Sequence, residues 1–297
     1  MELLFLGTSS MVPTKERNHS AILLTYGAEN ILLDCGEGTQ RQLKMAGVAS
    51  PKITKILISH WHGDHVLGLP GLLQTISASE YSKILEIYGP RGTKKHFEYI
   101  KKAFFFEEKF EVKVREIEED GIFFENEDFC IEAKLLEHTV PCLGYRFSEK
   151  AKRKIKVDAA KKLGIPQGPL LGKLQEGKSV TWKGKKIMPE QVTYEKEGKS
   201  VAFILDTVMC ESCVGLAKDA DILVCEATYS EELEHKAEEY KHLTAKSAAM
   251  IANRANVKQL VITHFSPRYK NPEKLAEEAR NYFDKTLCAK DFMRIRV

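Results

Sequence analysis

Four side chains that can bind metal ions occur within the six residues HWHGDH at positions 60–65, directly after an apolar run that predicts a strand. Alternate residues of extended backbone share a face, so His60 and His62 can converge on one ion. The glycine permits a sharp turn, after which Asp64 and His65 can face a second point. Imidazole and carboxylate ligands without a thiolate favour Zn²⁺, with Mn²⁺ as the alternative, in an open two-metal hydrolytic centre. A polar loop with surface histidines is the other interpretation, which four ligands at this spacing disfavour.

Three further candidate ligands each follow a predicted strand directly. They are His138 after residues 131–136, Asp206 after 201–205 and His264 after 260–263. A side chain in this position leaves the sheet and can reach a surface site, although each residue alone could equally serve in a turn. A consistent assignment gives the first ion His60, His62 and His138 and the second ion Asp64, His65 and His264, with Asp206 bridging the two. Such a pair of ions would activate a water molecule for hydrolysis.

The elements that must position these side chains alternate between strands and helices. In the first half, the pattern predicts strands at 3–6, 21–25, 30–34, 53–58, 85–88, 110–117, 129–136 and 144–147 and helices at 38–45, 66–76 and 94–103. In the second half, it predicts strands at 201–205, 222–225, 260–263 and 292–297 and helices at 211–218, 244–253 and 272–283. Two mixed halves meeting face to face predict an α/β (α+β) fold, a four-layer αββα sandwich. Ligands at strand ends in both halves would then meet at one rim.

The segment from Glu149 to Glu197 differs from the rest in composition. It holds thirteen Lys or Arg and six Asp or Glu, a charge of +7, whereas the whole chain carries +3 and the remainder therefore −4. Glycine and proline in residues 164–178, GIPQGPLLGKLQEGK, argue against a long regular element. We expect a protruding, flexible arm that is too polar to build a core of its own. A solvated surface loop is the alternative, but the clustered charge favours an anionic partner.

Composition bounds the class of protein. The chain has 297 residues, 43% of them hydrophobic, enough for one large domain or two merged halves. No run approaches the roughly 20 apolar residues of a membrane helix, and the N-terminus lacks the pattern of a signal peptide, so we expect a cytoplasmic protein without a membrane partner. Seven scattered cysteines argue against a disulfide framework, and we interpret the single CxxC at 210–213 as structural, with redox chemistry or zinc binding as the alternatives.

Several motifs together resemble one known family. The HxHxDH pattern at 60–65 resembles that of the metallo-β-lactamase-fold hydrolases, and other segments resemble RNase Z, the endonuclease family that trims tRNA 3′ ends. The matching residues are Pro13, Lys15, Arg17 and Asn18 for the PxKxRN loop, Glu226-Ala227-Thr228 with His242 for an acidic-Ala-Thr and histidine pair, His264 to Tyr269 with Ser266 and Arg268 for the HxSxRY segment, and Gly168-Pro169 for the arm. One departure is Val208-Met209 after Asp206-Thr207, where relatives often have glycine or arginine and proline.

The resemblance implies a single metallo-β-lactamase-fold domain over residues 1–297 with a tRNA-binding arm inserted at about 149–197. It implies two Zn²⁺ per subunit, a homodimer, and cleavage of precursor tRNA after the discriminator base, leaving a 3′-hydroxyl and a 5′-phosphorylated trailer. Asp64 would orient or deprotonate the attacking water while also serving as a ligand. His242, paired with Glu226, would protonate the leaving oxygen, because a carboxylate raises the pKa of a neighbouring imidazole. Without the resemblance, His242 would be interpreted as a surface residue at a helix start.

The resemblance also implies contacts to the RNA. Lys15, Arg17 and Asn18 would judge the nucleotides after the cleavage site, notably a CCA end, with cations on phosphate and the amide on a base edge. Ser266 and Arg268 would also bind the substrate, and Gly168 and Pro169 would belong to the arm that grips the tRNA body.

Two rival functions remain. One is an enzyme of the same fold that acts on a small ester, thioester, lactam or cyclic phosphodiester, which would need neither the arm nor the PxKxRN loop. The other is a noncatalytic RNA-binding protein with a structural metal, disfavoured by the open bridging position and by the His242–Glu226 pair.

Overall fold

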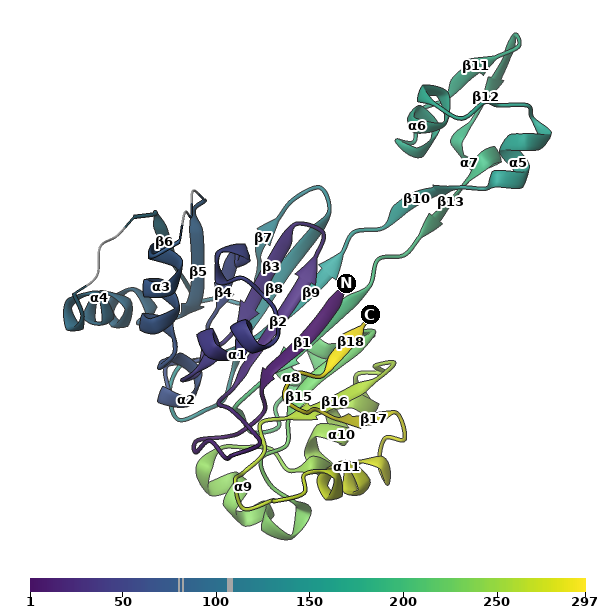
Figure 1. Cartoon of the computed structure of the whole chain (residues 1–297). Coiled ribbons are helices and arrows are strands. Elements are labelled where there is room, and N and C mark those ends of the chain that lie inside the picture. The colour runs from purple at the N-terminus through teal and green to yellow at the C-terminus, as the bar shows by residue number, and fades with distance from the viewer. Residues whose placement is uncertain (80, 82, 106–108) are drawn as a thin grey trace. The chain divides into compact units, whose positions relative to one another are not determined.

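Figure 1 shows the computed structural model of the chain, which describes residues 1–79, 81, 83–105 and 109–297. The described residues form two compact units. The larger, here called the body, comprises Met1–Glu125, Ile131–Phe147 and Ser200–Val297. The smaller, here called the arm, comprises Asn126–Cys130 and Ser148–Lys199.

The first sheet of the body begins with antiparallel pairs and continues with parallel ones. Its described strands run in the order β18-β1-β2-β3-β4-β5-β6. Their bounds are β1 (Glu2–Gly7), β2 (Ala21–Tyr26), β3 (Glu29–Leu33), β4 (Lys55–Leu57), β5 (Leu85–Pro90), β6 (Val112–Ile117) and β18 (Arg294–Arg296). Pairs from β18 to β3 are antiparallel and pairs from β3 to β6 are parallel. The helices α1 (Thr39–Met45), α3 (Leu69–Ser77) and α4 (Thr93–Ala103) pack their apolar sides into the core cluster of this sheet.

The second sheet carries the other half of the body. Its described strands run in the order β17-β16-β15-β14-β9-β8-β7. Their bounds are β7 (Gly121–Glu125), β8 (Phe129–Leu136), β9 (Cys142–Glu149), β14 (Ser200–Ile204), β15 (Ile222–Glu226), β16 (Leu260–Thr263) and β17 (Thr286–Cys288). The helices α8 (Glu211–Ala217), α10 (Ala245–Arg254) and α11 (Glu273–Arg280) cover it through small buried side chains such as Ala248 and Ala276.

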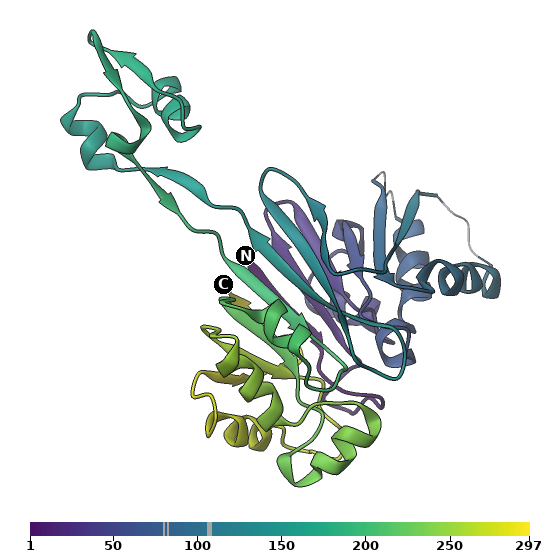
Figure 2. The same cartoon turned by 180° about the vertical axis from the view of Figure 1, so that it is seen from behind.

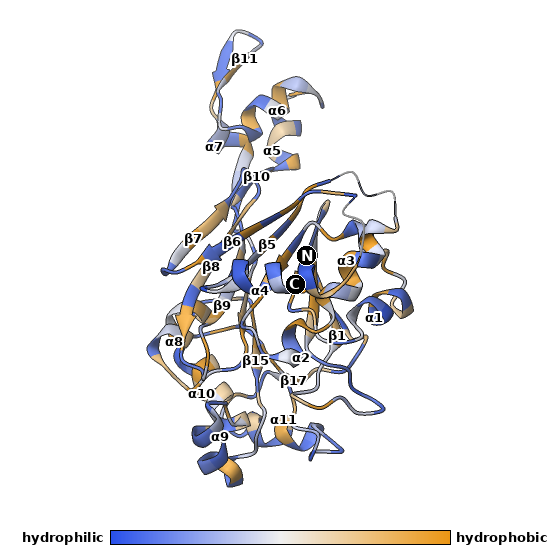
Figure 3. Cartoon of the chain, turned by 90° about the vertical axis from the view of Figure 1, so that its left-hand side faces the viewer, coloured by the Kyte–Doolittle hydropathy of each residue, from blue (hydrophilic) through white to orange (hydrophobic). Residues whose placement is uncertain are grey.

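The two sheets of the body lie face to face with helices outside them, as Figures 1 and 2 show. The facing side chains include Leu24 and Leu57 from the first sheet and Ile131, Tyr145 and Phe203 from the second. The Tyr145 hydroxyl donates to the Ile58 carbonyl over 2.7 Å, so the buried phenol is satisfied. On the outside, α9 (Glu234–Tyr240) is coloured mostly as hydrophilic in Figure 3. The predicted αββα sandwich is confirmed.

Some element boundaries differ from the sequence prediction. The helix predicted over 66–76 is two helices, α2 (Gly63–Val66) and α3, joined through Gly68. A Cβ at Gly68 would lie 2.0 Å from the Gly36 carbonyl oxygen, so only glycine permits the backbone to approach Gly36 this closely. The structure also contains β7, which the sequence analysis did not predict. None of the described helices has both the length and the apolar character that a bilayer span requires.

The arm has more order than the sequence predicted. The strands β10 (Lys152–Ile155) and β13 (Thr193–Lys196) pair as an antiparallel ribbon. The elements between them in the chain surround a small core. They are α5 (Val157–Lys162), α6 (Pro169–Gln175), a hairpin of β11 (Val180–Trp182) and β12 (Lys185–Ile187), and α7 (Pro189–Val192). The core side chains are Ile165, Leu174, Val180, Ile187 and Val192. The prediction that this segment is too polar for a core is therefore wrong, because its few apolar residues are spaced so that separate elements bring them together.

Candidate metal centre and catalytic site

The candidate ligands gather because each follows a strand of the body. The segment His60–His65 leaves β4 and enters α2, whose first residue is Gly63. His138 follows β8, Asp206 follows β14 and His264 follows β16. His264 has φ 60, a left-handed conformation that is uncommon outside glycine and that occurs at functional sites.

One group of ligand atoms combines His60, His62, His138 and Asp206. Nδ1 of His62 lies 3.0 Å from Nε2 of His60 and 3.2 Å from Nε2 of His138. Oδ2 of Asp206 lies 3.7 Å from His60 Nε2 and 3.9 Å from His138 Nε2. Burial and the neighbouring His65 lower the pKa of His60, which keeps this imidazole neutral and able to ligate.

A second group combines Asp64, His65 and His264, and the other oxygen of Asp206 faces it. Nε2 of His65 lies 3.1 Å from Nε2 of His264, and Oδ2 of Asp64 lies 3.4 Å from each. Oδ1 of Asp206 lies 3.2 Å from His264 Nε2 and 3.5 Å from His65 Nε2. Asp206 thus turns one oxygen to each group, the arrangement expected of a bridging carboxylate.

The outward nitrogens of two histidines are held by a buried aspartate and serine. Ser59 donates its backbone N–H to Asp34 Oδ1 and its hydroxyl to Asp34 Oδ2, each over 2.7 Å. Asp34 Oδ2 also lies 2.5 Å from His65 Nδ1, and the Ser59 hydroxyl oxygen lies 3.0 Å from His60 Nδ1. Because both acceptors take the Nδ1 proton, the network assigns a free lone pair to Nε2 of His65 and of His60.

The same pattern holds for two more histidines. Nδ1 of His138 lies 2.9 Å from the Lys241 carbonyl oxygen. Nδ1 of His264 lies 3.0 Å from the Thr228 hydroxyl, which donates its own proton to Glu226 Oε2 over 2.5 Å. Nε2 of both histidines is therefore left as an acceptor that faces the cluster. Outer acceptors that fix the tautomer in this way are typical of metal-binding histidines.

The electrostatics of the cluster also fit a cation. Oδ1 of Asp206 is buried and has no hydrogen-bond donor among the described residues, a costly arrangement unless an ion supplies the missing partner. Burial lowers the pKa of His65, but the charges of Asp206 and Asp34 outweigh it and raise that pKa well above its usual value. The Nε2 site of His65 therefore attracts a proton or a metal ion, which compete for one lone pair. The donor set present fits two divalent ions.

His242 lies beside the cluster and pairs with Glu226. Its Nδ1 is 3.1 Å from Glu226 Oε2 and 3.8 Å from Asp206 Oδ2. Burial lowers the pKa of His242, but the charges of Glu226 and Asp206 outweigh it and raise the pKa to about 9. With Nδ1 engaged by Glu226, the remaining ring nitrogen is available to the cavity that His242 lines.

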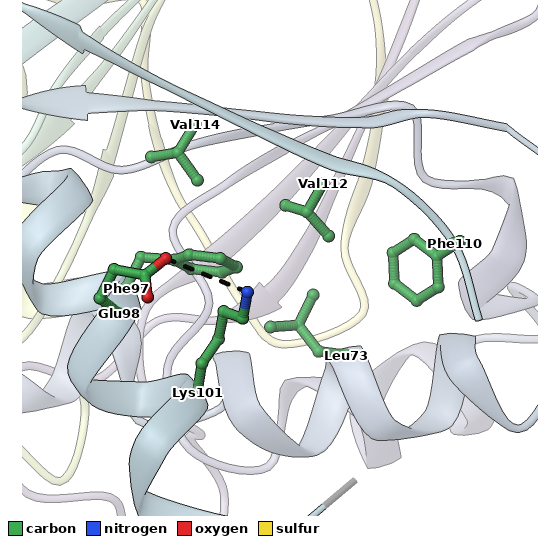
Figure 4. Close-up of a pocket in the computed structure, with 7 residues that line it drawn as sticks. All are labelled: Leu73, Phe97, Glu98, Lys101, Phe110, Val112 and Val114. Atoms are coloured by element: carbon green, nitrogen blue, oxygen red, sulfur yellow. Dashed lines mark ion pairs between the residues drawn. The ribbon is translucent and has the colours of Figure 1, made fainter. Parts of the chain in front are cut away.

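That cavity has a volume of about 340 Å³ and opens over the cluster. His62, Asp64, His138, Asp206 and His242 line it. A separate cavity of about 240 Å³ lies between α3, α4 and β6 and contains none of the predicted site residues (Figure 4). Its lining combines apolar side chains such as Leu73 and Val112 with the Glu98–Lys101 ion pair.

The N-terminal loop reaches the cluster through its backbone. The Met11 N–H donates to Asp64 Oδ2 over 2.8 Å. Lys15 is exposed, whereas Arg17 is only 7% exposed and donates from Nη2 to the Ser266 carbonyl over 3.4 Å. Asn18 donates its side-chain amide to the Glu37 carbonyl over 2.7 Å.

The remaining predicted contact residues lie in two different units. In the body, the exposed Arg268 donates from Nε to the Ser266 hydroxyl over 3.0 Å, and its guanidinium lies 5.2 Å from the centre of the Tyr229 ring. In the arm, Gly168 and Pro169 begin α6, and Gly168 has φ 135, which favours glycine.

The residues that hold the ligands from outside were not predicted from the sequence. Asp34 could have been found, since it is the last residue of a predicted strand and follows an apolar run, much like the other strand-end candidates. No sequence pattern points to Ser59 or Lys241. A serine next to a histidine is common, and Lys241 acts through its backbone carbonyl, which every residue has.

An αββα sandwich with a histidine and aspartate cluster at its strand ends defines the class of metallo-β-lactamase-fold proteins. The solved structure of the metallo-beta-lactamase fold protein YhfI from Bacillus subtilis matches with a TM-score of 0.72 at 18% identity, over 99% of this chain and 98% of that one. The family described as Anti-Pycsar protein Apyc1 matches residues 1–98, which include HWHGDH but not the later motifs.

Relatives over the whole chain narrow the class to one family. Ribonuclease Z of Methanothermobacter thermautotrophicus is 42% identical over all of this chain and 97% of its own. The crystal structure of the short form of human tRNase Z has a TM-score of 0.75 and 30% identity, over 100% of this chain and 99% of that one. The chain belongs to the ribonuclease Z family and is a metal-dependent endoribonuclease.

Proposed function

We propose that this enzyme is a zinc-dependent endoribonuclease that removes 3′ trailers from precursor tRNA. It cleaves after the discriminator base and leaves a tRNA 3′-hydroxyl and a 5′-phosphorylated trailer. The observation that carries the proposal is the convergence of seven histidine and aspartate side chains in one cluster beside the His242–Glu226 pair, under the cavity that His242 lines. Full-length relatives named ribonuclease Z support the substrate.

In this proposal, the residues that hold two Zn²⁺, or Mn²⁺ as the alternative, are His60, His62 and His138 for one ion and Asp64, His65 and His264 for the other, with Asp206 shared. The ions would supply an activated water and neutralise the charge that develops on the phosphate.

Asp64 orients the attacking water, and His242 donates a proton to the leaving oxygen. Burial raises the pKa of Asp64, but hydrogen bonds with His264 and His65 outweigh it and hold that pKa well below its usual value, so Asp64 is an anion that can orient the attacking water. His242 keeps a proton on the nitrogen that faces the cavity, because Glu226 stabilises its charged form. That proton passes to the 3′-oxygen of the tRNA as the phosphodiester bond breaks.

The substrate contacts are divided between body and arm. Lys15, Arg17 and Asn18 belong to the loop that judges the nucleotides after the cleavage site. The exposed Lys15 is suited to phosphate, and Arg17 supports Ser266, next to the exposed Arg268. The arm, including Gly168 and Pro169, contains the segment 149–197 with its charge of +7 and binds the tRNA body through phosphates.

We further propose a single metallo-β-lactamase-fold domain over residues 1–297 with the arm as an insert at about 149–197, acting as a cytoplasmic homodimer. Exposed aromatic side chains in the second half of α4 and directly after it support a second copy as partner. They are Tyr99 (54% exposed), Phe104 (47%) and Phe105 (107%). Light scattering after gel filtration tests this. A dimer that becomes a monomer in Phe105→Asp supports it, and a monomeric wild-type chain contradicts it.

The activity is tested by comparing two substrates with and without a chelator. We expect chelator-sensitive cleavage of a 3′-extended precursor tRNA and only weak hydrolysis of bis(p-nitrophenyl) phosphate. Replacing His235, an exposed histidine of α9, by alanine is the matched control and should leave both rates unchanged. Efficient hydrolysis of the small diester with no cleavage of precursor tRNA would indicate the rival small-substrate enzyme instead.

A further inference from the structure

Cys210 and Cys213 form a pair of thiols that the proposed function does not use. Cys210 directly precedes α8, and Cys213 lies in its first turn. Their sulfur atoms are 3.4 Å apart, and the Cys213 N–H donates to the Cys210 carbonyl over 3.1 Å. A disulfide has a sulfur–sulfur distance of about 2.05 Å, so closure needs a movement of only about 1.4 Å.

The two thiols differ in exposure and acidity. Cys210 is partly exposed, whereas Cys213 is fully buried. The hydrogen bond with the Cys213 thiol lowers the pKa of Cys210 to about 6 against the opposing effect of burial, and the same hydrogen bond together with burial holds the pKa of Cys213 well above its usual value. One accessible nucleophile beside one protected thiol is the pattern of dithiols that exchange with disulfides.

The buried cysteines elsewhere in the body have the opposite character. Burial raises the pKa of every one of them, as expected of inert thiols in a core. They are Cys35, Cys142, Cys225 and Cys288.

We propose that Cys210 and Cys213 are a thiol–disulfide exchange site that closes to an internal disulfide in reaction with small-molecule disulfides such as oxidised glutathione. The Cys210 thiolate attacks one sulfur of the oxidant, forms a mixed disulfide and releases one thiolate. The Cys213 thiol then loses its proton, attacks Cys210 Sγ and releases the second thiolate. The two protein thiols give up two electrons and the oxidant becomes two thiols.

The site lies close to the proposed metal centre along the chain. The segment that begins at Asp206 ends at Cys210. Within it, the Val208 carbonyl oxygen lies 3.8 Å from the Cys213 sulfur, and the Val208 N–H donates to the Glu137 carbonyl over 3.0 Å. The exchange chemistry nevertheless requires only the two cysteines and the oxidant, so it does not depend on the nuclease assignment.

The test is a redox titration of the full-length chain in glutathione buffers without oxygen, followed by acid quenching, alkylation of all remaining thiols in denaturant and peptide mass spectrometry. We expect two of the seven thiols to disappear in a single two-electron transition, with the disulfide in the peptide that contains Cys210 and Cys213. Cys130→Ser, a change at another partly exposed cysteine, should keep this transition.

Two variants separate the roles of the thiols, with circular dichroism to verify folding. Cys213→Ala should accumulate a glutathione adduct at Cys210, because the resolving thiol is missing. Cys210→Ser lies at the partly exposed position, where folding is least at risk, and should lose the transition. Alkylation of all seven thiols throughout the titration, or an unchanged transition in Cys210→Ser, would overturn the proposal.

Discussion

Replacing Asp34 by asparagine tests how the outer residues fix the metal ligands. Asp34 is fully buried, and its Oδ2 lies 2.5 Å from His65 Nδ1 and 2.7 Å from the Ser59 hydroxyl. An amide nitrogen at this position donates instead of accepting. His65 Nδ1 would then become the acceptor, and its proton would move to Nε2, the atom that faces Asp64, Asp206 and His264. The second group of ligands would lose one lone pair while its shape stays almost unchanged.

Loss of such an outer partner reduces metal affinity by about 10–100-fold, or about 1.4–2.7 kcal/mol. Competition with a chromophoric chelator for Zn²⁺ at pH 7 would measure it. We expect Asp34→Asn to weaken the ion held by His65 by this factor and to weaken the other ion less, because Asp34 reaches His60 only through the Ser59 hydroxyl. Asp221→Asn, at a buried aspartate that accepts from the Ser200 N–H over 2.8 Å, is the matched control and should bind both ions normally. Wild-type affinity for both ions in Asp34→Asn would refute the reasoning.

Four further predictions use other parts of the structure. His242→Ala should retain both metals but slow single-turnover cleavage of precursor tRNA by about 10²–10⁴-fold, because the proton donor is lost; near-normal turnover would remove His242 from the mechanism. Arg17→Ala should reduce discrimination between CCA-bearing and CCA-less precursors in cleavage assays, since Arg17 holds the Ser266 carbonyl, and unchanged discrimination would reject that role. Residues 150–198 can be replaced by a short turn, because the Glu149 N–H donates to the Lys199 carbonyl over 2.8 Å and the two ends of the segment are therefore close. In filter assays, this variant should lose precursor binding and its salt dependence far more than it loses hydrolysis of a small diester. Equal loss of precursor binding and of diester hydrolysis would make the arm structural. Burial raises the pKa of Asp291 to about 6, above the ordinary value of an aspartate. The folded state therefore binds a proton that the unfolded state lacks at pH 5, so the free energy of unfolding should rise by about 1 kcal/mol from pH 7 to pH 5; urea titrations of Asp291→Asn should lack this increment.

The sequence predicted the fold well where periodicity and chemistry agreed. Parallel strands such as β14, β15 and β16 are buried on both faces, so their apolar runs are unmistakable and their ends locate Asp206 and His264. The split between α2 and α3 was missed because it depends on a tertiary contact at Gly68, which no local pattern records.

The candidate site was predictable in its inner part only. The spacing of His60 and His62 predicts them as ligands. The tautomers of the histidines, in contrast, depend on groups such as the Lys241 carbonyl, which only the fold brings near. The core of the arm was missed for a related reason, since Leu174 and Val192 are isolated apolar residues in a basic segment and only their meeting makes a core.

The most direct test of the central claim is to map the ends of the RNA that the purified enzyme produces from a 3′-extended precursor tRNA. We predict one cut after the discriminator base, a 3′-hydroxyl on the tRNA and a 5′-phosphate on the trailer, all abolished by a chelator and restored by Zn²⁺. A 2′,3′-cyclic phosphate end, cleavage scattered along the RNA, or full activity in the presence of the chelator would contradict the account.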